Sequence, residues 1–224
     1  MRIIAVFEKS RRIRHIGHLD IQRAVQRGLR RSGLPVAYSQ GFNPHILITF
    51  ASALSTGACG TREIMDVKMA EPVTEDAFVS SLNHAMPPEL QISEARAVDD
   101  RHPAVMASLK AASYDLLIRD ARQAACIAAA IPDMMSRDSI PAIRKTKTGM
   151  KECDIKPLIY SLDAREQHIF TTVALTEKEA CKPDMLISAL REQANMTDEI
   201  RVLITRTALL GEDENGNFCP LEKL

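Results

Sequence analysis

The sequence predicts a mixed α+β protein in which the order β-α-β-β-α-β occurs twice. Three observations support this prediction. Segments of alternating hydrophobicity are followed by segments with a helical period, Gly and Pro mark the boundaries, and the same order begins again after residue 105. The chain has 224 residues, of which 46% are hydrophobic and 26% charged, so it is long enough for one large folded domain or two small ones.

The first half begins with a strand and a helix. Residues 2–8 alternate as in a strand that is covered on both faces, and residues 19–32 change to a helical period with one apolar stripe. Gly33 follows the helix and ends it. The remaining predicted elements are strands at residues 36–39, 46–51, 63–70 and 90–98, and a helix at residues 74–86.

The second half repeats this order after a connection over residues 99–112. Its predicted elements are strands at residues 114–119, 151–162, 168–175 and 200–210, and helices at residues 121–131 and 183–194. Two such passes predict two tandem ferredoxin-like halves, which span residues 1–104 and 105–224. The two halves share little sequence, so the repeat is one of pattern only.

No part of the sequence indicates export or insertion into a membrane. No apolar run approaches the roughly 18 residues that cross a bilayer, and the N-terminus becomes charged too early for a signal peptide. We therefore expect a soluble, cytoplasmic protein. The five cysteines lie far apart, which is typical of reduced thiols and offers no two metal ligands within one turn. The sequence predicts neither a metal site nor a cofactor.

Basic residues gather at the start of a chain whose formal net charge is zero. Residues 1–45 hold only two acidic residues, Glu8 and Asp20, whereas the next fifty are mainly acidic. Arginine presents a planar fork of donors that fits phosphate oxygens, and spacings of three and four place side chains on one helix face. The predicted anion-binding arginines are Arg11, Arg12, Arg14, Arg23, Arg27, Arg30 and Arg31. The alternative is a solvated helix face that the acidic segment neutralises.

A second basic stretch covers residues 144–151 (RKTKTGMK) and precedes a predicted strand. Gly149 allows a tight turn, so the stretch reads as the edge of a basic hairpin. Lysines on an outer strand also discourage edge-to-edge aggregation, and this structural role explains the pattern equally well.

Residues 38–45 (YSQGFNPH) form a polar loop that carries several rings. Tyr38, Phe42 and His45 are suited to stack on an unpaired base, while Gln40 and Asn43 can read the edge of that base. The loop is therefore a predicted part of an RNA-binding surface. The alternative is a rigid connection that places Phe42 in the core.

Three histidines and one tyrosine are candidates for acid–base chemistry. His15, His18 and His45 are candidates because histidine is the residue type most often used as a general acid or base, and Tyr38 lies in the same part of the sequence as His45. His15 and His18 individually also fit a structural role.

Three segments resemble a known family. The chain is similar to the radical-SAM-linked family of bacterial proteins, which is an uncharacterised domain family. The similarity lies in residues 14–20 (RHIGHLD), residues 33–45 (GLPVAYSQGFNPH), and the later residues 147–149 (KTG) and 154–159 (DIKPLI). The resemblance implies association with a radical S-adenosylmethionine enzyme and no established reaction. Ile46 stands where many members have a second proline, and the three-cysteine motif of the radical enzymes is absent. The resemblance therefore implies a companion protein of the radical enzyme.

These observations lead to two main hypotheses. In the first, the chain is an accessory RNA-binding or substrate-presenting protein that contacts tRNA or rRNA and serves a radical SAM partner. In the second, it is a metal-independent RNA-processing enzyme, by fold-level analogy with CRISPR repeat-processing endoribonucleases. A purely structural adaptor is a third reading.

Overall fold

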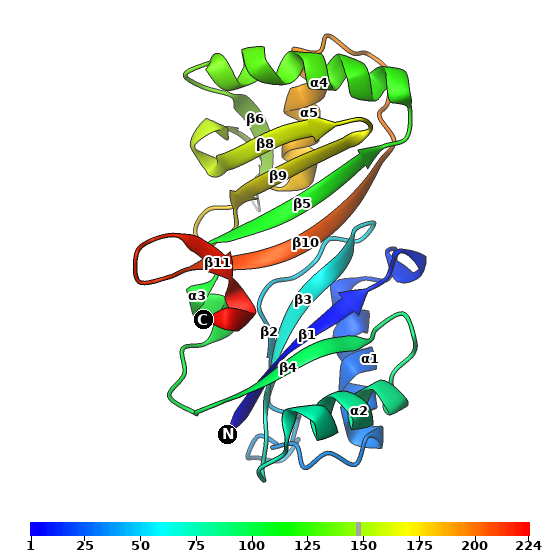
Figure 1. Cartoon of the computed structure of the whole chain (residues 1–224), viewed down its shortest axis with the longest axis vertical. Coiled ribbons are helices and arrows are strands. Elements are labelled where there is room, and N and C mark those ends of the chain that lie inside the picture. The colour runs from blue at the N-terminus through cyan, green and yellow to red at the C-terminus, as the bar shows by residue number, and fades with distance from the viewer. Residues whose placement is uncertain (147–148) are drawn as a thin grey trace. The chain divides into compact units, whose positions relative to one another are not determined.

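The computed structural model describes residues 1–146 and 149–224 and forms two compact units (Figure 1). Unit 1 contains Met1–Leu109 and Ala208–Leu224, and unit 2 contains Lys110–Thr207. Strand β10 (Val202–Glu212) begins in unit 2 and ends in unit 1. The fold is mixed α+β, as predicted. The compact units divide the chain after Leu109 and again within β10. The predicted boundary after residue 104 stays a prediction.

Unit 1 contains an antiparallel sheet in the order β4-β1-β3-β2, and β11 pairs with the end of β10. Its strands are β1 (Arg2–Lys9), β2 (Ile48–Phe50), β3 (Cys59–Lys68), β4 (Ile92–Val98) and β11 (Phe218–Pro220). Its helices are α1 (His18–Arg31), α2 (Glu75–Ala85) and α3 (Val105–Ser108), with short 3-10 turns η1 (Arg11–Ile13) and η3 (Leu221–Lys223).

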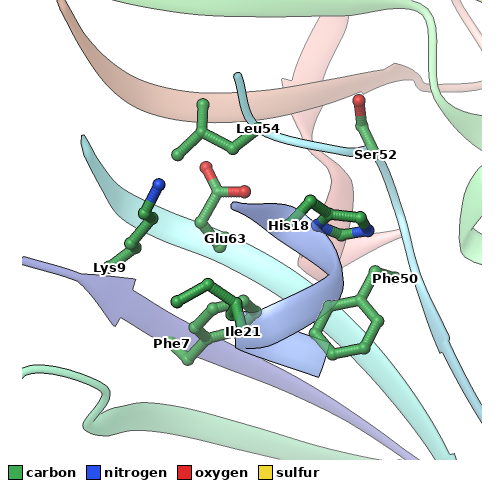
Figure 2. Close-up of a pocket in the computed structure, with 8 residues that line it drawn as sticks. All are labelled: Phe7, Lys9, His18, Ile21, Phe50, Ser52, Leu54 and Glu63. Atoms are coloured by element: carbon green, nitrogen blue, oxygen red, sulfur yellow. The ribbon is translucent and has the colours of Figure 1, made fainter. Parts of the chain in front are cut away.

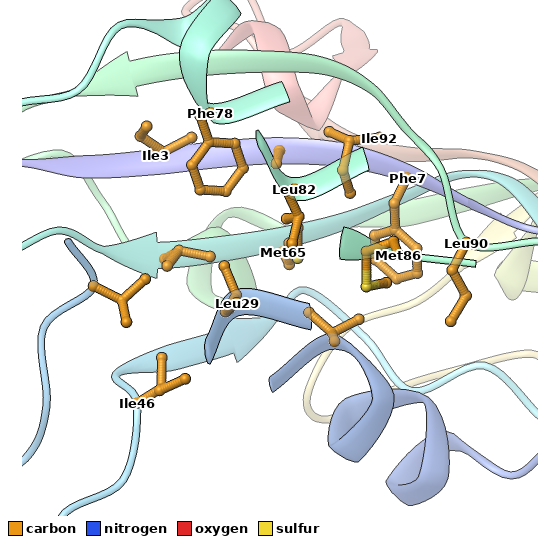
Figure 3. Close-up of a cluster of buried hydrophobic side chains, with 14 of the residues drawn as sticks. Ile3, Phe7, Leu29, Ile46, Met65, Phe78, Leu82, Met86, Leu90 and Ile92 are labelled. Atoms are coloured by element: carbon orange, nitrogen blue, oxygen red, sulfur yellow. The ribbon is translucent and has the colours of Figure 1, made fainter. Parts of the chain in front are cut away.

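The core of unit 1 lies between one face of this sheet and helices α1 and α2 (Figure 3). Alternate residues of a strand point to the same side, and β1 sends Ile3, Ala5 and Phe7 to this face. The apolar stripe predicted for the first helix is confirmed, because its members Ile21, Val25, Gly28 and Leu29 are buried. Burial of this stripe leaves the arginines of α1 on the outer face of the helix.

A glycine of α1 lies where this helix packs against the end of α2. A Cβ atom at position 28 would collide with the side chain of Met86, which follows α2 and is buried in the same core. Gly28 therefore lets α1 approach α2, and this approach fixes where the outer face of α1 lies.

Unit 2 contains strands in the order β10-β5-β9-β8, and a separate two-stranded hairpin, β6-β7. Strand β9 is antiparallel to β5 and to β8. The elements are β5 (Ala111–Ile118), α4 (Ala121–Ser136), β6 (Pro141–Thr146), β7 (Gly149–Asp154), η2 (Lys156–Leu158), β8 (Ile159–Arg165), β9 (His168–Ala174) and α5 (Pro183–Gln193).

Three element predictions differ from the structure. The predicted strand at residues 151–162 is wrong, because a 3-10 turn that contains Pro157 separates β7 from β8 and proline donates no ladder hydrogen bond. Helix α4 continues past Pro132 to Ser136, and burial of Met134 anchors this last turn. The predicted strand at residues 36–39 is reduced to isolated bridges.

The longest described helix, α4, has 16 residues. None of the helices in the described ranges combines the length and the apolar character that a membrane span requires.

Candidate nucleic-acid interface and a buried polar pocket

Four predicted arginines lie on the outer face of α1. Arg23 forms an ion pair with Asp20 on the same helix (2.9 Å), and Arg31 Nη2 donates to the carbonyl oxygen of Ala85 at the end of α2 (2.7 Å). Arg27 and Arg30 are exposed, and their guanidinium groups make no ion pair or hydrogen bond within residues 1–146 and 149–224. These two side chains therefore keep all their donors available to a ligand.

The acidic residues that follow in the sequence pair mainly with other cations. These ion pairs are Asp66 with Arg2, Glu94 with Arg62 (2.7 Å) and Asp100 with Lys68 (2.5 Å). Hydrogen bonds from the paired cations lower the pKa of Glu94 and the pKa of Asp100. Glu89 does contact a predicted arginine, Arg12, at 3.6 Å. The expected neutralisation of the helix face by the acidic segment does not extend to Arg27 and Arg30.

The basic loop before α1 is held by a buried lysine. The carbonyl oxygen of Arg14 accepts from Lys9 Nζ (3.0 Å) and from the backbone N–H of Gly57 (2.8 Å). Arg14 Nη1 donates in turn to the carbonyl oxygen of Arg11 (3.0 Å), while Arg11 and Arg12 are exposed. Lys9 thus fixes the conformation of the loop that presents these arginines.

The same lysine lines a small polar cavity at the end of β1 (Figure 2). The cavity has a volume of about 10 Å³, which is room for about one water molecule. Its walls are Phe7, Lys9, His18, Ile21, Phe50, Ser52, Leu54 and Glu63. Lys9 and Glu63 are only 2% and 4% exposed. Opposite charges that face one cavity offset part of the cost of burying each of them.

Packing restricts the other polar members of this pocket. The His18 ring lies edge-on to Phe50 with 5.5 Å between ring centroids, and its Nε2 is 3.0 Å from Gln22 Nε2. A Cβ atom at Gly60 would collide with the Glu63 carboxylate. Sequence reasoning selected His18 but missed Lys9 and Glu63 as members of a pocket. One signal in the sequence pointed to Lys9, because it lies two residues after Phe7 and so falls on the same side of β1 as the buried residues.

The polar loop is a short hairpin that is closed at its base. Tyr38 and Ile46 form a bridge, and the Ser39 N–H donates to the His45 carbonyl oxygen (2.8 Å). The Ser39 hydroxyl lies 2.8 Å from His45 Nδ1 and accepts from the His45 N–H (3.1 Å). Phe42 at the tip is fully exposed, so the alternative that placed it in the core is wrong.

The four acid–base candidates do not form one group. Lys9, beside His18 in the cavity, pairs with Gly60 at one end of β3. The hairpin of Tyr38 and His45 joins β3 at its other end, where Ala37 and Leu47 bond to Lys68. His15 is exposed in the loop before α1. His18 and His45 therefore lie at opposite ends of the strand. Gln40 and Asn43, like Phe42, are exposed in the hairpin loop.

The second basic stretch is described in part. Arg144 Nη2 donates to the carbonyl oxygen of Ala180 (2.7 Å), and Gly149 takes a positive φ of 135°. Lys147 and Thr148, which begin the second quoted motif, lie outside the described residues.

No group of three or more His, Cys, Asp or Glu side chains within residues 1–146 and 149–224 is arranged to hold a metal ion. Cys126, Cys153, Cys181 and Cys219 form no disulfide within the described residues. Cys59 and Cys181 are buried, whereas Cys126 is exposed. Burial raises the pKa of the Cys181 thiol to about 12, so this thiol is a poor nucleophile at neutral pH.

Comparison with known proteins identifies a family. No curated protein matches the chain. A bacterial family described as "Uncharacterized protein conserved in bacteria (DUF2344)" matches residues 2–183. The link to radical SAM enzymes stays a prediction. Because the match covers more than half of the chain, this protein belongs to the uncharacterised bacterial family DUF2344.

Proposed function

We propose that the protein is a non-catalytic, accessory RNA-binding protein. One observation supports this proposal most. The exposed Arg27 and Arg30 side chains have no carboxylate partner among residues 1–146 and 149–224, although many acidic residues lie in the same unit. Exposed arginine forks at helical spacing are suited to successive phosphates of a nucleic-acid backbone. Arg11 and Arg12 are exposed and Arg14 is half-buried in the loop before α1, and we include them in the proposed RNA-binding surface.

The hairpin loop adds a contact of a different kind. Phe42 exposes its whole ring at the tip of a loop that the hydrogen bonds between Ser39 and His45 hold closed. Stacking of an unpaired base on an exposed aromatic ring contributes about 1–3 kcal/mol to binding. This geometry supports an RNA ligand with unpaired bases, such as a loop of tRNA or rRNA.

Two finer proposals concern fold and partner. Along the chain, each unit follows the order β-α-β-β-α-β. Across the sheet, the strands of each unit lie in the order fourth, first, third, second, which supports two ferredoxin-like units. Unit 2 then carries the β6-β7 hairpin as an insertion. We further propose a radical SAM enzyme as the partner. This proposal rests on the sequence resemblance alone.

The test is a filter-binding titration of purified protein against bulk tRNA and rRNA, at salt concentrations from about 50 mM to about 200 mM. We expect the double variant Arg27→Ala with Arg30→Ala to weaken binding about tenfold at low salt and to reduce the salt slope by roughly 1.5. Arg31 is less suitable for substitution, because it also bonds to Ala85.

The matched control is the double variant Arg101→Ala with Arg122→Ala. These arginines are also exposed, and their side chains make no ion pair in the described part of the chain. The control should bind RNA like the unmodified protein. Equal affinities and equal salt slopes for both double variants would exclude the arginine face as the RNA-binding surface.

The alternative, a metal-independent RNA-processing enzyme, has less support because His18 and His45 lie at opposite ends of β3. A cleavage assay in the presence of a chelator distinguishes the two functions. Specific cleavage that His45→Ala abolishes would favour the enzyme, whereas binding without cleavage agrees with the accessory role.

A further inference from the structure

Unit 2 contains a groove that the proposed function does not use. It has a volume of about 660 Å³ and lies between helix α5 and the β6-β7 hairpin, and β6 and α5 are close neighbours in Figure 1. A second hollow of about 200 Å³ adjoins it, because Pro141, Ala189 and Glu192 line both.

The hairpin turns exposed apolar side chains toward this groove. Ile143 pairs with Glu152, and Lys145 pairs with Met150, so these four positions share one face of the hairpin. Ile143 and Met150 are 61% and 69% exposed, although both are large and apolar. Met185 and Ala189 of α5 contribute the opposite apolar wall. Apolar side chains that gather in an exposed hollow are typical of an interaction site.

Carboxylates occupy both walls of the groove. Asp184, Ser188 and Glu192 are spaced by four residues along α5, which places them on one face over roughly 12 Å. Glu152 lies on the hairpin wall. The carboxylates of Glu152, Asp184 and Glu192 make no ion pair or hydrogen bond with any side chain or backbone group of the described residues.

The position of Glu192 does not favour the stability of α5. Glu192 lies in the last turn of the helix, where the dipole disfavours a negative charge. The next residue, Gln193, lines the smaller hollow, and its Oε1 is a buried acceptor without a hydrogen-bond partner in the described part of the protein. A buried acceptor of this kind is satisfied when a ligand donates to it.

We propose that this groove binds an amphipathic, basic α-helix of a partner protein. The apolar face of that helix packs between Met150 and Met185, and its Lys or Arg side chains, two turns apart, meet Asp184 and Glu192. Among the described lining residues, the carboxylates of Glu152, Asp184 and Glu192 favour a cationic partner. The proposal rests on unit 2 alone, so it does not depend on RNA binding by the arginine face.

The test uses the full-length protein and a labelled synthetic peptide of about five helical turns, with Leu on one face and Lys on the other. Fluorescence anisotropy should show binding of this peptide, and no binding of the same peptide with Glu in place of Lys. Glu152→Gln with Glu192→Gln should weaken binding about fivefold. Met150→Ser should weaken it about tenfold, because an apolar contact is lost.

The matched control is Glu177→Gln with Asp198→Asn, which removes two exposed carboxylates of unit 2 outside the groove and should leave the affinity unchanged. Thermal melting confirms that each variant is folded, and Glu192→Gln should not lower the Tm because it removes a charge that the helix dipole disfavours. Equal binding of both peptides, no binding of the basic peptide, or an unchanged affinity in both groove variants would overturn the proposal.

Discussion

The outer face of α1 in unit 1 and the groove of unit 2 have opposite charges and one property in common. On α1, Arg27 and Arg30 lack anionic partners in the described chain, although acidic residues of the same unit pair with other cations. In the groove, Glu152 and Glu192 have no cationic partner among the side chains that the structure describes. A formal net charge of zero therefore conceals two surfaces of unmatched charge. Because unmatched charge gains nothing within the fold, we infer that each surface serves a different partner.

The largest expected effect comes from the buried cation beneath the arginine surface. Lys9→Met leaves the buried Glu63 carboxylate in the cavity without this cation, and it removes the hydrogen bond to the Arg14 carbonyl. We expect a loss of about 3 kcal/mol in the free energy of unfolding, measured by urea denaturation. RNA binding should weaken as well, because the basic loop loses its anchor.

Arg11→Ala is the control for that experiment. Arg11 lies in the same loop but is exposed, so its removal should leave the free energy of unfolding unchanged within about 0.5 kcal/mol. If Lys9→Met proved as stable as Arg11→Ala, the buried lysine would have no structural role in presenting the loop.

The next effect separates stacking from charge. Phe42→Ala should weaken RNA binding by about 2 kcal/mol, or about thirtyfold, because one base loses its stacking partner. The salt dependence should stay the same, because no charge is removed. The Tm should not change, since the Phe42 ring is fully exposed in the free protein. Phe42→Tyr retains the ring and should bind normally, whereas equal weakening by both substitutions would argue against stacking.

A smaller effect tests whether the arginine face needs guanidinium forks or only positive charge. Arg27→Lys with Arg30→Lys keeps both charges, so the salt slope should be retained. The affinity should nevertheless fall about threefold, because an ammonium group cannot bind a phosphate in bidentate fashion. An unchanged affinity in filter binding would mean that the surface acts through charge alone.

The smallest effect concerns the hairpin that forms one wall of the groove. Asp154 Oδ1 accepts from the backbone N–H of Ile140 (2.8 Å) and of Lys156 (2.9 Å), and these bonds lower its pKa below 3.8. Its contribution to stability is therefore complete above about pH 4 and is lost as the pH falls through the lowered value. Asp154→Ala should lower the Tm by a few degrees at pH 7.

The difference in Tm between the unmodified protein and Asp154→Ala should shrink as the pH is lowered below about 4, because the aspartate of the unmodified protein then becomes protonated as well. Asp154→Asn keeps an oxygen acceptor and should show a smaller loss at pH 7. A difference that is independent of pH would contradict the assignment of the effect to the carboxylate.

The sequence predicted the elements of unit 1 well where the signal was local. The stripe that includes Ile21 and Val25 identified the buried face of α1 by its period alone, and the arginine face followed from it. The pocket was missed because its members come from separate segments, and only the fold brings Glu63 of β3 to Lys9 of β1. His18 was recognised as a residue type, but its neighbours depend on this tertiary arrangement.

Unit 2 was less accessible to sequence reasoning. The β6-β7 hairpin was merged with the following strand, since residues 151–162 show no strong interruption apart from Pro157. Residues 144–151 were predicted as the edge of a hairpin, but no strand was predicted at residues 141–146. Ile143 could therefore not be recognised as a neighbour of Met150 on one face.

The most direct test of the central claim is RNA binding by the unmodified protein as a function of salt. We predict that filter binding with bulk tRNA or rRNA shows micromolar or tighter affinity at about 50 mM salt, and that the affinity falls steeply toward about 200 mM. Absence of binding at low salt, or binding that does not respond to salt, would contradict the assignment of the arginine face to a nucleic-acid backbone.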